Sequence, residues 1–221
     1  MEQTEKPPLS DEDRARSDCY ALISRLFYSP ADPDLLAQLG KQPELTMQDE
    51  TPGLQLIEIE PPPQPTAYTV AFNELVEASR TTDPAVIRQE YDDLFTGAGK
   101  ALVTPYTSGY AVPHAPDRHL VALREHLIAW GLARHDTVFE IEDHVSAVCD
   151  VMRWLIERER PLEEQQAFFN DFVYTGVGTF CDAIEARAST PFYRAVAALA
   201  RAFLKVERDA FELNAGNSTP E

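Results

Sequence analysis

The segment Tyr91–Tyr110 reads YDDLFTGAGKALVTPYTSGY, and the rest of the chain is best understood around it. Tyr91, Leu94 and Phe95 are spaced i, i+3 and i+4, so on a helix they form one apolar face. Gly97 follows and suits the position just past a helix end, where a left-handed backbone is needed. An irregular arm comes next and carries Pro105, Tyr106, Ser108 and Tyr110. The segment therefore predicts an apolar helical face that ends sharply beside an aromatic-bearing loop, which is one way to build a groove.

The sequence Gly97–Lys100 contains G-x-G-K, which is only part of a phosphate-binding loop. The full loop needs a glycine where Leu94 stands and a serine or threonine where Ala101 stands. The preceding pattern is also helical, whereas such a loop follows a strand. A nucleotide hydrolase that uses Lys100 is therefore an alternative that the missing loop residues disfavour.

Length and composition indicate one large domain with a sizeable core. The chain has 221 residues, of which 44% are hydrophobic, and its 17 prolines cluster in a few places. It has no run of 18 apolar residues, and its acidic N-terminus does not resemble a secretory signal. Cys19, Cys149 and Cys181 are odd in number and far apart, which favours free thiols in a reducing compartment. We therefore expect a cytoplasmic protein.

The formal net charge of −18 narrows the classes of partner. Nucleic acids and anionic membrane surfaces require basic protein surfaces, so neither is an expected partner. An acidic protein instead suits a basic partner, which it can attract by charge complementarity. Acidity that only maintains solubility, or that reflects a salt-adapted source, is the alternative interpretation.

Helical periodicity dominates the chain and predicts an all-α, single-domain bundle of about eight to ten helices. Ser10 and Asp13 resemble a capping box at the start of the first helix. Gly176 and Gly178 are expected to kink or break a later helix. We predict a flexible, Pro-rich loop over 41–65 and a mobile tail over 215–221. The helices are expected near residues 10–29, 34–39, 68–80, 84–95, 116–130, 141–159, 163–184 and 191–214.

No catalytic or metal-binding constellation stands out, so we expect no enzyme activity, metal or cofactor. The five histidines match no H-E-x-x-H or Cys/His spacing. Glu142, Asp143 and His144 are expected in the first turn of a helix, where carboxylates suit the helix dipole. They are either a helix cap with a surface histidine or an acidic rim that meets a basic residue of a partner.

Taken together, these stretches resemble the TorD/DmsD family of redox-enzyme maturation chaperones. Its motifs are aromatic-x-x-L-F-x-G, then P-P-[YW]-x-S-x-[YW], then E-x-x-D-H-[IF]. This sequence departs from the residues that are usual in the family at Ala98, Thr104, Thr107, Val148 and Gly176. These departures leave the identity of the client protein open. The matching residues, in order, are Tyr91, Leu94, Phe95 and Gly97, then Pro105, Tyr106, Ser108 and Tyr110, then Glu140, Asp143 and His144.

The resemblance implies an all-helical protein without catalysis of its own. Such chaperones bind the twin-arginine signal peptide, or the mature part, of a DMSO-reductase-type molybdoenzyme. They hold the apo-enzyme in the cytoplasm until its molybdenum cofactor is inserted. By analogy, the acids Glu140, Glu142 and Asp143 would pair with the arginines, and His144 would shape that rim. The apolar part of the peptide would contact Tyr91, Leu94, Phe95, Tyr106 and Tyr110.

The resemblance also sets the expected partners and the alternatives. Beyond the apo-molybdoenzyme, cofactor-biosynthesis proteins are a further expected class of partner. The chain is expected as a monomer or a domain-swapped dimer, because helical bundles can exchange elements. A non-catalytic adaptor or regulatory scaffold, which binds another basic or apolar segment, is the alternative function.

Overall fold

The computed structural model describes residues 9–46, 65–97, 101–133 and 140–217. The chain divides into two compact units. The first comprises Met1–Tyr28 and Tyr106–Gly176, and the second comprises Ser29–Pro105 and Val177–Glu221. Every regular element in the described ranges is helical, apart from an isolated bridge between two single residues, and this confirms the all-α prediction. The single-domain organisation stays a prediction.

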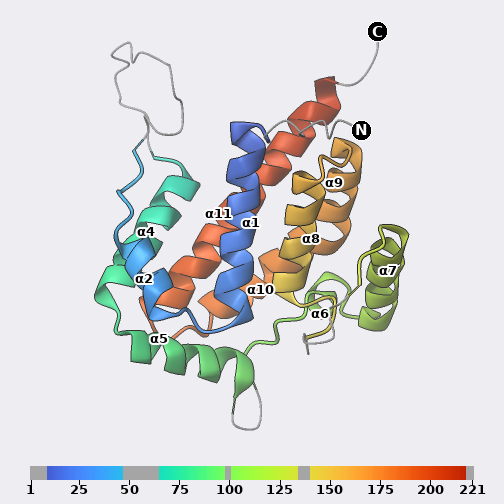
Figure 1. Ribbon diagram of the computed structural model, residues 1–221. Helices are drawn as coiled ribbons and strands as arrows, with labels where there is room; N and C mark the ends of the chain where they lie inside the picture. The colour runs from blue at the N-terminus through green and yellow to red at the C-terminus, as the bar shows by residue number, and fades with distance from the viewer. Residues whose placement is uncertain (1–8, 47–64, 98–100, 134–139, 218–221) are drawn as a thin grey trace, which may run out of the picture. The chain divides into compact units, whose positions relative to one another are not determined.

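Two long helices that are far apart in sequence form the centre of the first unit. α1 (Asp11–Tyr28) packs along α8 (Val145–Glu157), as Figure 1 shows. The predicted capping box starts α1, because the Asp13 N–H donates to Ser10 Oγ at 3.0 Å. Each helix buries an apolar stripe, and each fully buried side chain contributes about 1.5–3 kcal/mol. The stripes include Tyr20, Ile23 and Phe27 on α1, and Val148, Met152 and Leu155 on α8.

The remaining elements of the first unit surround this pair. They are α6 (Ser108–Ala111), α7 (Pro116–Ala129), α9 (Leu162–Phe168) and the π-helical turn η2 (Phe169–Tyr174). A cluster of aromatic side chains links the end of α7 to α8 and α9, because the centroid of the Trp130 ring lies 5.6 Å from that of Phe168 and 6.2 Å from that of Trp154.

The second unit is built on its own long helix, α11 (Pro191–Asn217). α4 (Ala67–Thr81) packs against both α11 and α2 (Pro33–Gly40). The elements that complete the unit are α5 (Pro84–Tyr91), the π-helical turn η1 (Asp92–Thr96) and most of α10 (Thr175–Glu185), whose first two residues belong to the first unit.

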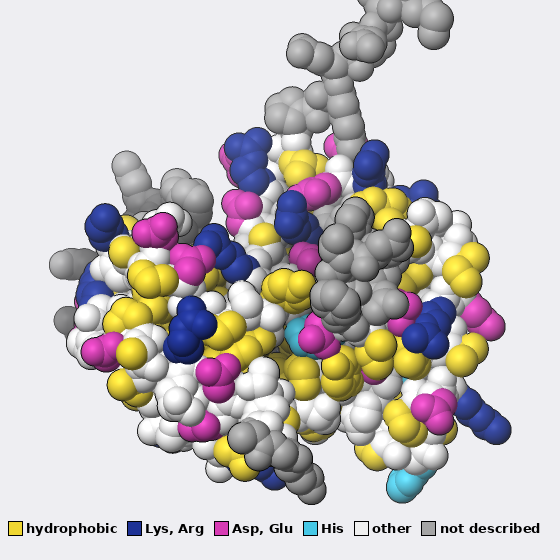
Figure 2. Space-filling model, turned by 60° about the horizontal axis from the view of Figure 1, so that its bottom comes forward, with side chains coloured by type: hydrophobic (Ala, Val, Ile, Leu, Met, Phe, Trp, Pro, Cys, Tyr) yellow, Lys and Arg dark blue, Asp and Glu magenta, His cyan; other side chains and the backbone are white. Residues whose placement is uncertain are grey.

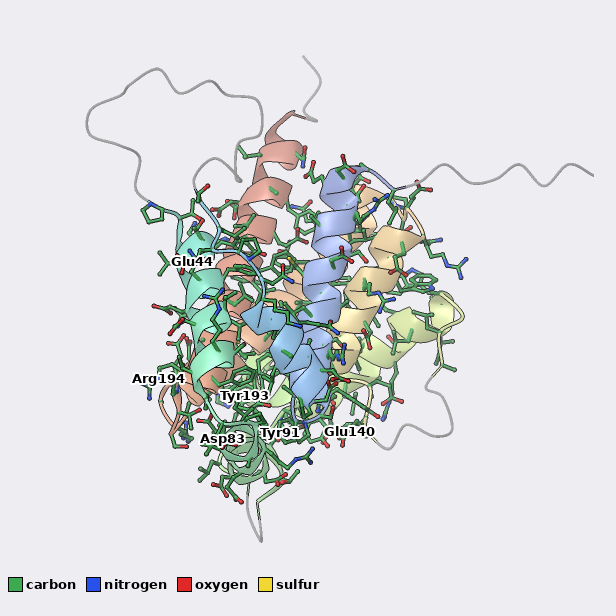
Figure 3. The ribbon with its side chains drawn as sticks, turned by 60° about the vertical axis from the view of Figure 1, so that its left-hand side comes forward. Glu44, Asp83, Tyr91, Glu140, Tyr193 and Arg194 are labelled. Atoms are coloured by element: carbon green, nitrogen blue, oxygen red, sulfur yellow. The ribbon has the colours of Figure 1, made fainter. Side chains whose placement is uncertain are left out.

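An aromatic cluster lies in the core of the second unit, and Figure 3 labels two of its members, Tyr91 and Tyr193. The Phe95 ring lies 5.0 Å from Tyr91, 5.6 Å from Tyr193 and 5.9 Å from Phe180. Tyr91, Leu94 and Phe95 form one apolar face, as the spacing predicts, and all three are buried. Gly97 ends this helical stretch with φ of +46°, the positive value expected at that position. The face that was expected to line a groove therefore packs within the unit.

The long C-terminal helix begins at a buried carboxylate. Glu90 is 2% exposed and accepts a hydrogen bond from the Thr190 N–H at 2.7 Å. Its second oxygen accepts from the Thr190 hydroxyl. Free N–H groups at a helix N-terminus favour negative charge, so Glu90 caps α11 from a distant part of the sequence.

Three sequence-based expectations about helix ends and breaks are wrong. α8 begins at Val145 and not at Ile141, so Glu142 and Asp143 lie in a turn before the helix. The helix continues through Gly176 and Gly178, and the irregular part is the preceding π-helical turn. α11 extends to Asn217, into the predicted tail, and residues 218–221 lie outside the described ranges.

The loop that was predicted over 41–65 follows the end of α2 at Gly40 and precedes the start of α4 at Ala67. Its first part is held in place, because Asn73 on α4 exchanges two hydrogen bonds with the Leu45 backbone, at 2.8 and 3.1 Å. Arg80 donates to the Gln42 carbonyl at 2.8 Å. Residues 47–64 lie outside the described ranges.

The surface carries scattered charges and ion pairs. On the face in Figure 2, acidic side chains are interspersed with basic and hydrophobic ones. Several ion pairs are local to one helix, such as Arg160–Glu164 and Lys205–Asp209, and exposed pairs of this kind contribute little to stability. None of the described helices combines the length and the apolar character that crossing a membrane requires.

Candidate binding site

The loop before α6 and the turn before α8 are joined at one junction in the first unit. Tyr106 and His144 form the isolated antiparallel bridge. The Thr107 N–H and the Thr107 hydroxyl both donate to the Asp143 carbonyl, at 2.8 and 3.0 Å. The Ser108 N–H donates to Asp143 Oδ2 at 3.3 Å. Three hydrogen bonds to Asp143 and the bridge between Tyr106 and His144 therefore fix the arm to the turn, and the periodicity of neither segment reveals this.

His144 is the N-cap of α8 and a buried part of this junction. Its Nδ1 accepts a hydrogen bond from the Ser146 N–H at 3.2 Å, so that nitrogen carries no proton. The ring is 3% exposed and meets the edge of Tyr106 at a centroid distance of 5.7 Å. Burial lowers the pKa of His144, against the opposite effect of Glu140 and Asp143. The histidine itself therefore forms the cap and is buried, whereas the carboxylates were expected to form it beside a surface histidine.

Tyr106 and Glu140 form the strongest polar contact beside this histidine. The Tyr106 hydroxyl donates to Glu140 Oε2 at 2.6 Å. Burial, the hydrogen bond to Glu140 and the negative charges of Glu140 and Asp143 raise the pKa of Tyr106 to about 12. The phenol therefore stays protonated and holds the carboxylate as an acceptor.

Gly176 lets α10 pass against the junction. A Cβ atom at this position would lie 2.7 Å from Thr107 Cβ and 3.1 Å from the Thr107 carbonyl oxygen. Real Cβ atoms do not approach that closely, so any other residue would displace Thr107 or the helix. Gly178, two residues on, has nothing within 4 Å of its Cβ position. The first glycine is thus required by close approach and the second is not.

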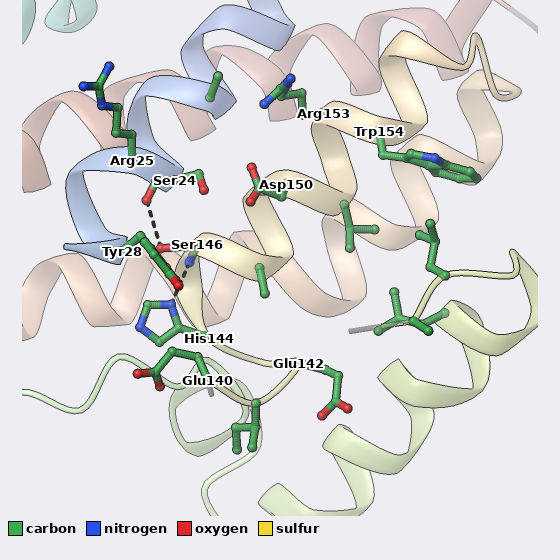
Figure 4. Close-up of a pocket in the computed structure, with 17 residues that line it drawn as sticks. Ser24, Arg25, Tyr28, Glu140, Glu142, His144, Ser146, Asp150, Arg153 and Trp154 are labelled. Atoms are coloured by element: carbon green, nitrogen blue, oxygen red, sulfur yellow. Dashed lines mark hydrogen bonds between the residues drawn. The ribbon is translucent and has the colours of Figure 1, made fainter. Parts of the chain in front are cut away.

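A pocket of about 640 Å³ opens in the first unit beside the junction (Figure 4). The segment before α8 contributes Glu140, Ile141, Glu142 and His144. α1 contributes Ala21, Ser24, Arg25 and Tyr28, and α7 with the residues after it contributes Leu127, Leu132 and Ala133. The wall from α8 consists of Ser146, Ala147, Asp150, Val151, Arg153 and Trp154.

The charged groups of the pocket differ in how they are paired. Glu142 Oε2 accepts two bonds from Arg124, at 2.8 and 3.0 Å, and Arg153 Nε lies 2.7 Å from Glu157. Asp150 has no basic nitrogen within 4.0 Å in the described ranges of the chain. Burial raises its pKa, against the opposite effects of Ser24 and Arg153. The pocket is lined mainly by apolar groups, and its Asp150 carboxylate lacks an ion-pair partner in the described chain.

The residues predicted as a binding site divide between the two units. Tyr106, Ser108, Tyr110, Glu140, Glu142, Asp143 and His144 belong to the first unit, and Tyr91, Leu94, Phe95, Gly97 and Pro105 to the second. Glu140, Glu142 and His144 line the pocket, whereas Asp143 and Ser108 are buried at the junction. Tyr110 lies in α6 and donates its N–H to the Thr107 carbonyl. One groove shared by all twelve residues stays a prediction.

The described residues offer no group of three or more histidine, cysteine, aspartate or glutamate side chains placed to hold a metal ion. The three cysteines are free thiols; Cys149 and Cys181 are buried and Cys19 is half-buried. Lys100 of the G-x-G-K sequence lies outside the described ranges, and the element before it is helical.

Comparison with known families matches residues 62–182 to the nitrate reductase delta subunit family, which is more than half of the chain. The chain belongs to this family. The match confirms the resemblance to the TorD/DmsD type of chaperone that the motifs indicated. It covers the junction, α7, α8 and Gly176, while α1 lies outside the matched residues.

Three proteins are similar in sequence to this member of the nitrate reductase delta subunit family. Chaperone protein YcdY of Escherichia coli is 27% identical over 62% of this chain and 72% of its own length. Chaperone protein TorD of Actinobacillus pleuropneumoniae is 26% identical over 77% of this chain and 75% of its own length. An uncharacterized protein of Haemophilus influenzae is 28% identical over 59% of this chain and 64% of its own, which is less than two thirds of that relative.

Sequence reasoning missed the part of the pocket that α1 and α8 supply. Ala21, Ser24 and Tyr28 recur at helical spacing beside the buried stripe of α1, and Ala147, Asp150 and Trp154 do the same on α8. The small or short polar side chains among them, Ala21, Ser24, Ala147 and Asp150, leave space between helices that otherwise pack closely. Periodicity shows that each stripe exists, but only the fold of this family member shows that the two stripes face one pocket.

Proposed function

We propose that this protein is a cytoplasmic maturation chaperone for a redox enzyme. It binds the apo catalytic subunit of a DMSO-reductase-type molybdoenzyme and holds it for molybdenum cofactor insertion and assembly before export. Family membership and the chaperone names of two relatives support this class of function. The chaperone itself carries out no reaction and acts only by binding.

The observation that carries the proposal is the composition of the pocket in the first unit. A twin-arginine signal peptide combines a basic region with an apolar region. The pocket has apolar walls from α1, α7 and α8, and it is bordered by the carboxylates of Glu140, Glu142 and Asp150. A segment that is basic at one end and apolar along its length is therefore a chemically matched occupant.

Residues at the junction have a different role from those in the pocket. Glu140, Glu142 and His144 are proposed to contact the client, while Tyr106, Ser108 and Asp143 hold them in place. Asp143 Oδ1 has no hydrogen-bond partner among the described residues, but the residue is 3% exposed, so it reaches a client arginine only if the junction opens. Tyr91, Leu94 and Phe95 are proposed to support the second unit, because their burial leaves little surface for a peptide.

Calorimetric titration with a signal peptide tests this function. The probe is the twin-arginine signal peptide of a DMSO-reductase-type molybdoenzyme, and we expect a Kd of about 1–10 μM. Ala147→Leu fills the pocket from α8 and should weaken binding at least about tenfold while the helical circular dichroism is kept. Ala85→Leu, on an exposed position of α5 outside the pocket, is the matched control and should bind like the wild type.

Two results would contradict the proposal. If neither the signal peptide nor the full apo-enzyme binds the wild-type protein, the client assignment fails and an adaptor for another segment is the better function. If Ala147→Leu binds the peptide as tightly as Ala85→Leu does, the client contacts another surface.

A further inference from the structure

Asp150 occupies a central place in the pocket that no motif of the sequence marks. It lies on the α8 wall, across from Ser24 of α1, between Ser146 at one end and Trp154 at the other (Figure 4). The residue is exposed to the space of the pocket, so an occupant can reach its carboxylate. Its neighbours in the wall are small or apolar, including Ala21, Ala147 and Val151.

The charged groups around Asp150 already have other partners. Arg153, one turn along α8, donates to Glu157 at 2.7 Å, and Glu157 also accepts from Ser17 of α1. On the segment before α8, Glu142 is held by Arg124 and Glu140 by the Tyr106 hydroxyl. Arg25 and Tyr28 of α1 and the neutral His144 complete the titratable groups of the lining. No basic nitrogen lies within 4.0 Å of the Asp150 carboxylate in the described chain.

A carboxylate in such surroundings selects for a guanidinium group. Its apolar neighbours replace part of its hydration, so a cation that enters the pocket regains an interaction that water supplies poorly there. A guanidinium is planar and weakly hydrated, and it can stack on an aromatic face such as the Trp154 indole, which lines the same wall. An ammonium group is more strongly hydrated and offers no planar fork, so it gains less.

We propose that Asp150 determines the specificity of the pocket by accepting the guanidinium of an arginine on the bound segment. This inference rests on the proposed function, because it assigns a role to one residue within that binding site. Glu140 and Glu142 then border the pocket, while Asp150 distinguishes arginine from lysine within it.

Titrations of the twin-arginine peptide and of its twin-lysine version provide the test. The wild-type protein should prefer the arginine peptide by about tenfold. Asp150→Asn keeps the size of the side chain and removes its charge, so it should weaken binding of the arginine peptide about 10- to 100-fold and bring the two affinities together. Asp150→Glu retains the charge and should restore part of the preference.

The control is Glu163→Gln, which removes one negative charge from an exposed position of α9 away from the pocket. It should leave both affinities and their ratio unchanged, which separates a local contact from the general effect of net charge. If Asp150→Asn binds both peptides as the wild type does, this inference is overturned and the chaperone function stands. If the wild-type protein binds neither peptide nor the apo-enzyme, the proposed chaperone function is overturned, and the role of Asp150 that rests on it is overturned as well.

Discussion

At the scale of single residues, the contact between Tyr106 and Glu140 is the most informative. The tyrosine pKa of about 12 lies above the ordinary value near 10, which means that the fold favours the protonated phenol. The stability that the protonated Tyr106 supplies to the fold is fully present below about pH 10. It is lost as the pH rises from about 10 to about 12, because in this range the tyrosine ionises in the unfolded chain before it ionises in the folded protein.

Tyr106→Phe tests this contact. The variant loses one hydrogen bond to a charged acceptor, so its free energy of unfolding at pH 7 should fall by about 1 kcal/mol, as measured in urea. Its stability should also decline less steeply between pH 10 and 12 than that of the wild type. Equal slopes for the two proteins in that range would show that Tyr106 does not hold its proton in the fold.

From the sequence, the identity of the junction residues could be predicted, but the contacts that they make could not. Tyr106, Ser108, Asp143 and His144 do meet in one place. Their contacts run through backbone groups and a buried ring, which residue type and spacing cannot show. Asp150 was missed because a single acid on a helix is ordinarily a solvated one, and only the neighbouring α1 turns its surroundings into a pocket.

At the scale of elements, the two glycines of α10 give a matched pair of predictions. Gly176→Ala places a Cβ 2.7 Å from Thr107 Cβ and should destabilise the protein by about 1–3 kcal/mol, while also weakening peptide binding through the displaced junction. Gly178→Ala has open space and should stabilise the helix by about 0.5–1 kcal/mol. Urea unfolding measures both, and a Gly176→Ala protein as stable as Gly178→Ala would show that the contact is not tight.

Helix existence could be predicted from periodicity, whereas helix ends and irregular turns could not. α8 starts at Val145 because the Asp143 carbonyl is used by Thr107 and His144 forms the cap. The π-helical turn before α10 has the same apolar residues as a regular helix, so no pattern separates it. The Tyr91–Phe95 face was predicted correctly as a face, but its burial depends on Phe180 and Tyr193, which are far along the chain.

At the scale of the whole molecule, net charge and pocket chemistry should affect different rate constants. A charge of −18 attracts a basic peptide over a distance that salt shortens, from about 30 Å at 0.01 M to about 3 Å at 1 M. Raising the salt concentration over this range should lower the association rate constant about tenfold or more in stopped-flow measurements. Asp150→Asn should act mainly on dissociation. A salt-independent association rate would indicate that the acidity serves solubility alone.

The pairing of α1 with α8 has a consequence for how the protein is made. α1 is complete once Tyr28 has been synthesised, but its partner begins only at Val145. At about 5–20 residues per second, this leaves roughly 10 s during which the nascent chain carries an apolar stripe with no helix to cover it. The first unit therefore closes late in translation, and a chain that stops before Val145 would expose Tyr20, Ile23 and Phe27 to the quality-control machinery.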